Sequence, residues 1–511
     1  MPQVHRVIKN TGFLYAKMGI TMFISLYTTH LILNALGASD FGIFNIVGGA
    51  ISMLGFLNAA MAGATQRFMS YSEGEGDKEK QKRIFNISFI LHLGIAVAMG
   101  IVLLIAGWFF FNGILNIAPE RIYAAKVVYG SLIVSTIFTV MTVPYDAVLN
   151  AHENMLYFSI VGVVESFLKL GAALALVYLA GDKLVLYGVL MACIPLFTMT
   201  IMRIYCHKHY AECVIATRRY WDKGLMKEMT GFAWWNLLGS SSGMISQYGL
   251  SIVLNNFFGT ILNAAQGIAN QLSGQLMVFS NTMMKAVNPI IDKSEGGGDR
   301  NLMLNATLIG SKFSFLLLAF FSIPFLIETP FILRIWLKNV PEWTVLFSRL
   351  QLGRSLIEQF TVMLGGAIAA KGDIKAYTSI KSILNILPIL LTYLFFHFDF
   401  PPYYLYITWI IAGGFLGGGL SLYYTKKKCG LKYSDFFKIV FIPSSGVSIL
   451  MFIVGIIPLF FMASSLVRLL FVSLITTMTF MLALFLVFLS NQEKKWIVGL
   501  IVSLKNKIKF A

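Results

Sequence analysis

Seven of the basic side chains inside long apolar stretches of this chain, where a charge is costly, are candidates for binding a ligand. They are Lys17, Arg67, Lys285, Lys312, Arg349, Arg354 and Lys381. Near the centre of a membrane-spanning helix such a charge costs roughly 2.5 to 3.5 kcal/mol, so it usually faces a cavity or a partner. Lysine and arginine bind anionic groups, and arginine can bind phosphate through two parallel hydrogen bonds. We therefore take these seven residues as the candidate site for an anionic ligand.

Two interior acids have basic neighbours at helical spacing. Glu165 lies four residues before Lys169, and Arg354 lies four residues before Glu358. Side chains four residues apart meet on one face of a helix. We predict that each acid forms a self-neutralising pair with its neighbour, so that the interior as a whole favours an anionic ligand.

The chain repeats itself near its midpoint. A shift of 222 positions, the separation of Gly37 from Gly259, also lays "SEGEGD" at 72–77 on "SEGGGD" at 294–299. Apolar matches along such a shift arise by chance, but a polar hexapeptide in register with the glycine does not. We predict a duplicated chain in which each half begins with two spans joined at a glycine turn, because glycine permits the positive φ that a bulky residue resists.

The same shift relates two of the candidate cations. Lys285 corresponds to position 63, one helical turn before Arg67, so both lie on the same face of repeat-related helices. We expect those faces to meet across a cavity, with Lys17 adding to a basic lining in its cytoplasmic half. Arg67 and Lys285 would then act together on one anionic group.

Composition indicates that these residues belong to a membrane protein with many spans. The chain is 57% hydrophobic and 12% charged, and its mean hydropathy is +0.75. A soluble protein of 511 residues could not bury so much apolar surface. The net charge of +17 does not indicate nucleic acid, because cytoplasmic loops of membrane proteins collect Lys and Arg.

The apolar segments predict an all-α fold of about fourteen transmembrane helices, each of roughly 20 or more residues. The predicted spans are 11–36, 41–69, 84–111, 121–149, 156–180, 183–206, 230–258, 262–290, 306–333, 343–370, 374–397, 402–425, 438–462 and 465–490. Basic residues concentrate in alternate connections, which places both termini in the cytoplasm. Lys312 and Lys381 lie near predicted span ends, and snorkelling to the membrane surface is an alternative role for each.

The repeat and the spans together predict five parts. These are an N-terminal six-helix bundle (1–206), a cytoplasmic linker (207–229), a C-terminal six-helix bundle (230–425), two additional transmembrane helices (426–490) and a basic amphipathic tail (491–511). The tail places apolar residues on one helical face with lysines around it, which suits a helix lying on the inner leaflet.

Motifs for catalysis and metal binding are weak. The predicted outer loops are very short, and no phosphate-binding loop of Walker type is present. "CHKHYAEC" at 206–213 fits no standard zinc spacing. "GGFLGGG" at 413–419 lies inside an apolar span, where small residues most often let helices pack closely. We expect no enzyme activity, no cofactor and no metal.

Two motifs carry a resemblance to a known family. "NALGASDFGIFNIVGG" at 34–49, and the loop "AHENMLYFS" at 151–159 echoed by "AKGDIKAYT" at 370–378, resemble the polysaccharide-exporter, or O-antigen-type flippase, branch of the multidrug/oligosaccharidyl-lipid/polysaccharide (MOP) superfamily. The resemblance implies a V-shaped pair of six-helix bundles with alternating access, in the cell (inner, cytoplasmic) membrane. It implies transport of a polyprenyl-diphosphate-linked oligosaccharide to the outer leaflet, for O-antigen, capsule or exopolysaccharide biosynthesis. Implied partners are membrane lipid and a polysaccharide polymerase or glycosyltransferases.

Two other functions stay open at this point. A lipid II flippase of peptidoglycan synthesis would use a cationic cavity equally well. A cation-coupled multidrug antiporter of the same superfamily needs an intramembrane carboxylate for its proton or sodium ion, whereas the first span contains no Asp or Glu and the two clear interior acids have basic neighbours.

Overall fold

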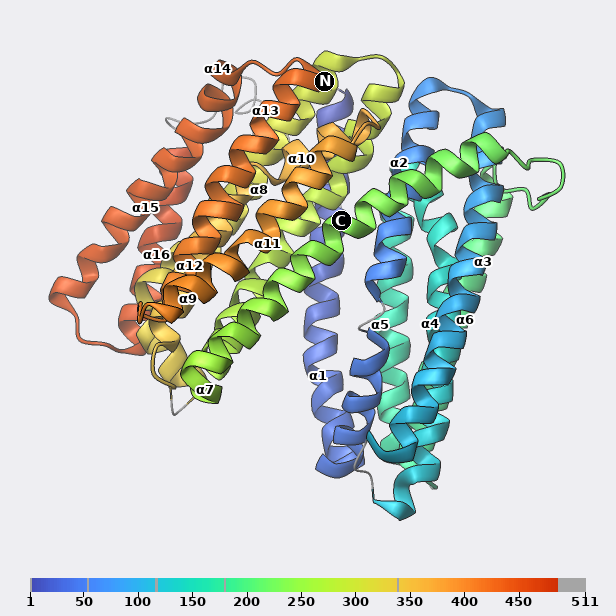
Figure 1. Cartoon of the computed structure of the whole chain (residues 1–511), viewed down its shortest axis with the longest axis horizontal. Helices are drawn as coiled ribbons and strands as arrows, with labels where there is room; N and C mark the ends of the chain where they lie inside the picture. The colour runs from blue at the N-terminus through green and yellow to red at the C-terminus, as the bar shows by residue number, and fades with distance from the viewer. Residues whose placement is uncertain (1, 53–54, 115–117, 179–180, 338–339, 486–511) are drawn as a thin grey trace, which may run out of the picture. The chain divides into compact units, whose positions relative to one another are not determined.

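The structure is a computed structural model that describes residues 2–52, 55–114, 118–178, 181–337 and 340–485. All regular structure in these ranges is helical, as the sequence predicts. The α-helices are α1 (Pro2–Ser52), α2 (Gly55–Glu75), α3 (Lys78–Phe109), α4 (Ile122–Ala151), α5 (Met155–Tyr178), α6 (Lys183–His209), α7 (Lys223–Gly296), α8 (Arg300–Leu337), α9 (Thr344–Gln359), α10 (Val362–Ala370), α11 (Lys375–His397), α12 (Tyr404–Trp409), α13 (Gly417–Cys429), α14 (Tyr433–Phe436), α15 (Ile442–Phe461) and α16 (Leu466–Ala483). Short π-helical segments lie at Phe110–Ile114, Ile410–Leu416 and Phe437–Phe441, and a 3₁₀ turn at Pro119–Arg121. Figure 1 labels the α-helices. The predicted tail lies outside the described residues.

Contacts divide the chain into two compact units. The N-terminal unit comprises residues 9–240 together with 292–299, and the C-terminal unit comprises residues 241–291 and those from 300 onward, with residues 2–8. The last turns of α7, which carry the second copy of the repeated hexapeptide, therefore pack within the N-terminal unit.

The chain breaks its helical conformation at both predicted turn glycines. Gly37 has φ 76° within α1, and Gly259 has φ 79° within α7. In the second hairpin, Ser251 Oγ donates a hydrogen bond of 2.8 Å to Gln266 Oε1. Residues 15 apart on a straight helix would be about 22 Å apart along the axis, so the chain must turn back at Gly259. The predicted backbone role of these glycines is confirmed.

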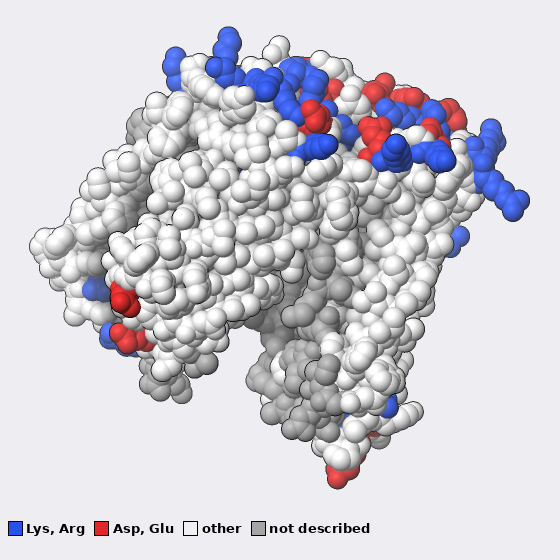
Figure 2. All heavy atoms as spheres, in the orientation of Figure 1, with Lys and Arg blue, Asp and Glu red and all other residues white. Residues whose placement is uncertain are grey.

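Nine helices in the described ranges are long and apolar enough to cross a membrane. They are Lys78–Asn112, Pro119–Ala151, Met155–Tyr178, Lys183–His209, Arg300–Leu337, Lys375–His397, Tyr404–Cys429, Tyr433–Phe461 and Leu466–Ala483. The other five predicted spans fall on α1 and α2, on the long α7, and on α9 followed by α10. Of these segments, α9 carries three charged residues, Arg349, Arg354 and Glu358. Figure 2 shows charged side chains gathered at the ends of the helices and uncharged ones over their flanks.

Small residues set the packing of the N-terminal unit. A Cβ on Gly188 of α6 would lie 2.9 Å from a methyl carbon of Val128 on α4. Ala124 and Ala125 are buried in the same cluster as Val128. Because lipid is as apolar as the helices, close backbone approach and dispersion, rather than hydrophobic transfer, hold such helices together.

The C-terminal unit contains a buried acid that the sequence analysis did not count among the interior acids. The Glu328 side chain on α8 is fully buried and accepts two hydrogen bonds from Arg468 of α16, at 2.7 and 2.9 Å. Glu165 and Glu358 are thus not the only interior acids. Glu328 was missed because its partner is 140 residues away, where no local spacing reveals it. The pair fastens α16, one of the two helices predicted to follow the second bundle, to α8.

Candidate functional site

Arg67 lies in an aromatic enclosure in the N-terminal unit. Its guanidinium carbon is 4.6 Å from the ring centroid of Phe68, 4.8 Å from that of Tyr71 and 5.4 Å from that of Phe232 on α7. The residue is only 7% exposed. Cation–π contacts strengthen when water is excluded, so these rings stabilise the buried charge.

Acidic residues also stabilise Arg67 electrostatically. Asp292 has the largest effect, followed by Glu228 of α7. Asp292 is itself buried, at 7% exposure, and immediately precedes the second hexapeptide. An anionic ligand that binds Arg67 must therefore compete with Asp292 for the same guanidinium. The sequence did not indicate that Asp292 lies near Arg67.

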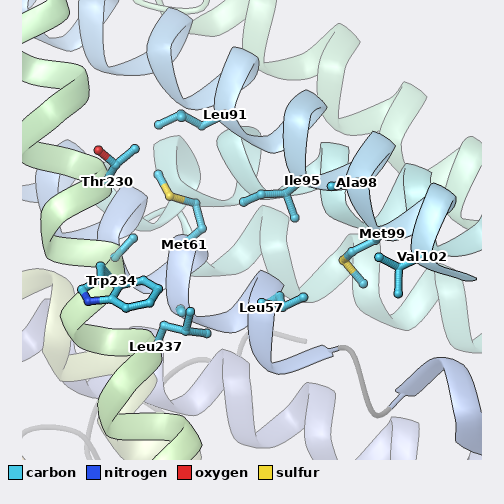
Figure 3. A pocket seen from close by; sticks show the side chains of 12 residues that line it. Leu57, Met61, Leu91, Ile95, Ala98, Met99, Val102, Thr230, Trp234 and Leu237 are labelled. Atoms are coloured by element: carbon cyan, nitrogen blue, oxygen red, sulfur yellow. The ribbon is translucent and has the colours of Figure 1, made fainter.

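An apolar cavity of about 330 Å³ lies beside this enclosure, also within the N-terminal unit. α2, α3 and α7 line it with residues that include Leu57, Ala60, Met61, Leu91, Ile95, Ala98, Met99, Val102, Thr230, Ala233, Trp234 and Leu237. Figure 3 shows Met61, Met99 and Trp234 around it. Phe232 connects the two features, because its ring faces Arg67 while the adjacent Ala233 lines the cavity.

The C-terminal unit holds a different cluster of charges. Arg354 of α9 donates to both carboxylate oxygens of Glu358, at 3.0 and 3.1 Å, and to Gln351 at 3.2 Å. Its guanidinium carbon lies 3.4 Å from the ring centroid of Trp409. Lys381 of α11 is close enough to Glu358 for electrostatic attraction. Two cations therefore share one carboxylate. The predicted Arg354–Glu358 pair is confirmed, as is Glu165–Lys169 at 2.7 Å.

The glycine motif makes room for this cluster. A Cβ on Gly413 would lie 2.9 Å from Glu358 Oε1, and one on Gly417 would lie 2.5 Å from Lys381 Nζ. Gly414 likewise faces Ile357. The predicted packing role is confirmed, and it extends to charged side chains. The segment Ile410–Leu416 is π-helical, a distortion that often marks functional sites in helices.

Arg349 has a structural explanation. Pro330 in α8 has no N–H, so the carbonyl of Leu326 four residues earlier lacks its helical donor. Arg349 Nε donates to that carbonyl at 3.1 Å, and Nη2 donates to the carbonyl of Ile327 at 3.4 Å. Arg349 thus satisfies the backbone at a proline-interrupted helix, and its role toward a ligand stays a prediction.

The remaining candidates occupy different environments. Lys312 is 2% exposed, so it is an interior residue of α8. Lys17 lies against Gly162 of α5, with its ammonium 4.1 Å from the ring centroid of Phe158. Lys285 is exposed on the part of α7 that belongs to the C-terminal unit, whereas Arg67 is buried in the N-terminal unit. Joint action of Arg67 and Lys285 stays a prediction.

The two copies of the repeated hexapeptide contact each other, which the sequence analysis did not foresee. A Cβ on Gly74 would overlap the carbonyl oxygen of Lys293, and a Cβ on Gly296 would overlap that of Tyr71. The segments approach so closely that only glycine fits at either position. A polar repeat within an apolar chain was the available signal, but nothing in it indicated mutual contact.

A network of charges surrounds this contact. Glu73 accepts a hydrogen bond of 2.8 Å from Lys78 and lies 3.5 Å from His152, which also hydrogen-bonds Glu212. Burial alone would raise the pKa of Glu73, but the hydrogen bond from Lys78 and the attraction of His152 hold it below its ordinary value. The pKa of the Glu212 carboxyl is lowered in the same way, mainly by His152, against the effect of burial. Among the described residues, no group of three or more His, Cys, Asp or Glu side chains is placed to hold a metal ion.

Comparison with known proteins finds similarity in fold. No protein-family model and no curated protein sequence matches the chain. Solved structures do match. An outward-facing multidrug resistance MATE family transporter of the MOP superfamily has 15% identity over 83% of this chain and 95% of its own, with a TM-score of 0.70. A MATE protein in the bent conformation has 17% identity over 83% and 97%, with a TM-score of 0.70. A MOP superfamily transporter from Pyrococcus furiosus has 15% identity over 84% and 96%, with a TM-score of 0.68. The chain therefore has the fold of the MATE transporters of the MOP superfamily.

Proposed function

We propose that this protein is a flippase that moves a polyprenyl-diphosphate-linked oligosaccharide from the inner to the outer leaflet by alternating access, for surface polysaccharide synthesis. The observation that carries the proposal is the charge balance around Glu358, where Arg354 and Lys381 share one carboxylate. The excess positive charge suits an anionic substrate. A diphosphate can accept charge-assisted hydrogen bonds from both cations.

The other parts of the proposal follow from this role. Arg67 and Lys285 act on the diphosphate as it leaves the inner leaflet, and the sugars cross through water while the polyprenyl chain stays in lipid. Both termini lie in the cytoplasm. Glycosyltransferases that build the substrate and a polymerase that uses it are the partners, and a proton or sodium gradient is a candidate energy source.

Pocket charge is a property that varies within this fold. The Pyrococcus furiosus transporter is described as having a binding pocket of reverse polarity, which suggests a different function for it. That precedent supports the use of charge, rather than fold, to distinguish an exporter of anionic lipids from a drug transporter.

Lys381→Gln tests the proposal. It removes the excess cation and leaves the Arg354–Glu358 pair intact, so lipid-linked oligosaccharide should accumulate inside cells at least tenfold at equal amounts of membrane-embedded protein. Lys169→Gln is the control, because it removes another lysine that pairs with an interior acid, Glu165, but whose side chain is 41% exposed. Unchanged export by Lys381→Gln would contradict the proposal. Rescue of cells depleted of their lipid II flippase would instead favour that substrate.

A multidrug antiporter is the second candidate, favoured by Glu358 as an interior carboxylate beside a π-helical segment. Drug efflux driven by an imposed proton or sodium gradient, and abolished by Glu358→Gln, would support it. We rank it lower because a cation approaching Glu358 meets Arg354 and Lys381 already there.

A further inference from the structure

We propose that the apolar cavity between α2, α3 and α7 holds the hydrocarbon chain of an anionic lipid whose phosphate lies against Arg67. This inference rests on the proposed function, which makes the lipid the polyprenyl-linked substrate. The cavity receives the segment of its hydrocarbon chain next to the phosphate. The inference thus divides the substrate between two features of the N-terminal unit, a buried cation and an adjoining apolar cavity.

The lining excludes sugars and other polar ligands. Among the described residues that form it, none is charged, and Thr230 provides the one hydroxyl. That hydroxyl donates to the carbonyl of Met226 at 2.8 Å within its own helix. The indole N–H of Trp234 is the other side-chain polar group, so most hydroxyls of a sugar in the cavity would lack partners, whereas a hydrocarbon chain needs none.

The shape of the cavity suits a flexible chain. Its volume of about 330 Å³ is at the lower end of the range for small-ligand sites, so it accommodates part of a long chain. Met61 and Met99 line it, and methionine adapts to irregular apolar surfaces. Val102 and Trp234 are 49% and 61% exposed, so the cavity is open at these residues and the rest of the chain can continue outward.

The positive charge of Arg67 next to the cavity indicates that the headgroup of the lipid is anionic. Ala60 of the lining and Arg67 are seven residues apart on α2, which places them on the same face and about 10 Å apart along the axis. Arg67 is therefore the cation next to the cavity on that face. An incoming phosphate takes over the electrostatic stabilisation that Asp292 gives the guanidinium. A neutral lipid could not do this, so the site selects an anionic one.

The test uses a polyprenyl phosphate with a photoreactive diazirine near its head end, added to the full-length protein in vesicles. We expect labelling of α2 and α3 at the cavity, mapped by mass spectrometry, and at least tenfold less labelling with the uncharged polyprenol. Arg67→Gln should reduce labelling by the phosphate to the level of the polyprenol. Equal labelling by the two probes, or full displacement by an equimolar amount of phosphatidylglycerol, would overturn the proposal.

A cavity-filling variant links the site to transport. Ala98 is an exposed residue of the lining, so Ala98→Trp fills the cavity without disturbing buried packing. Val97→Trp is the matched control, because Val97 is 53% exposed on the same helix and does not line the cavity. We expect Ala98→Trp to reduce labelling and export at least tenfold, and Val97→Trp to change neither.

The two proposals fail in different ways. In one outcome, Ala98→Trp blocks labelling but exports normally, and Lys381→Gln fails to export. The assignment of the cavity to the substrate's hydrocarbon chain is then wrong, and the flippase function stands. If neither variant reduces export, while labelling of the wild type still depends on the phosphate and on Arg67, the flippase function is wrong and the cavity binds an anionic lipid that is not a transported substrate.

Discussion

Arg67 and Arg354 are both interior arginines with aromatic and acidic neighbours, and the two units supply those neighbours from different distances along the chain. Arg354 has a carboxylate at bidentate hydrogen-bonding distance on its own helix. Arg67 is surrounded by three aromatic rings, and its strongest acidic partner, Asp292, comes from a segment more than 200 residues away. Arg354 thus depends on a carboxylate of its own helix, whereas the charge of Arg67 depends on rings and acids that α2 and α7 bring together. We therefore expect Arg67 to depend on the packing of α7, and Lys381 to supply the excess positive charge in the other cluster.

The largest effect should come from removing the shared carboxylate. Glu358→Gln leaves Arg354 and Lys381 without their shared carboxylate. Because the side chains of the Arg354–Glu358 pair are only 14% and 24% exposed, the cost should approach that of breaking a buried ion pair, about 3 to 5 kcal/mol. We expect a marked loss of folded protein in detergent, measured by thermal unfolding monitored with size-exclusion chromatography. Glu165→Gln is the control, since its pair is 37 to 41% exposed and should contribute at most about 1 kcal/mol. Equal effects of the two variants would mean that Arg354 does not need its partner.

A smaller effect should follow from separating the two hexapeptides. Gly74→Ala places a methyl group where the carbonyl of Lys293 now lies, and backbone cannot yield as a side chain can. Overpacking of this kind costs about 1 to 3 kcal/mol, and it should move Asp292 relative to Arg67. Gly76→Ala is an imperfect but useful comparison, because Gly76 has open space around its Cβ position and a positive φ. Thermal unfolding should show Gly74→Ala to be the more damaging of the two.

Valine at Gly37 or Gly259 tests whether a glycine is needed for its positive φ alone, without a steric clash. A Cβ at either position would meet nothing within 4 Å, so only the positive φ opposes it. The expected cost is about 1 to 2 kcal/mol. Folded protein in the membrane should fall, measured by fluorescence of a fused reporter, and substrate preference should not change. Normal expression with altered preference would refute this assignment.

Replacing Arg67 should affect export more than folding. Arg67→Gln should insert normally but reduce export at least tenfold, equivalent to about 1.4 kcal/mol. Arg67→Lys should also impair export, because an ammonium cannot form two parallel hydrogen bonds, whereas Lys285→Arg should be tolerated. Adding Asp292→Asn should restore stability lost in Arg67→Gln, since it removes a buried acid left without its cation. Full export by a well-inserted Arg67→Gln, Lys285→Gln double variant would show that these cations do not bind the diphosphate.

The smallest effect concerns pH. The lowered pKa values of Glu73 and Glu212 mean that both stabilise the fold when ionised. This contribution is complete above the ordinary glutamate pKa of about 4.3 and is lost as pH falls through the lower, folded values. Unfolding temperature should therefore drop on acidification below about pH 4.3, and Glu212→Gln should flatten that drop. An identical profile for the variant would mean that the pair with His152 contributes nothing.

Sequence reasoning predicted what depends on short spacing. Helical content, the glycine turns at Gly37 and Gly259, the four-residue ion pairs and the packing glycines near Gly417 were all predictable, because each follows from local geometry. It could not predict partners distant in sequence. The Glu328–Arg468 pair and the aromatic enclosure of Arg67 depend on how helices pack. The hydrogen bond from Arg349 to the carbonyl freed by Pro330 also joins two different helices.

The contact between the two hexapeptides has the form of an isologous dimer interface. Gly74 meets residue 293 and Gly296 meets residue 71, and the shift of 222 positions converts each contact into the other. A two-fold axis between identical subunits produces the same pattern. Residue i of one subunit contacts residue j of the other, and residue j of the first contacts residue i of the second. The fused chain thus keeps, at this point, the self-complementary surface of a symmetric pair of single-repeat proteins. A side chain at either glycine would meet the backbone of the other copy, so one geometric constraint, inherited twice, keeps both positions as glycine.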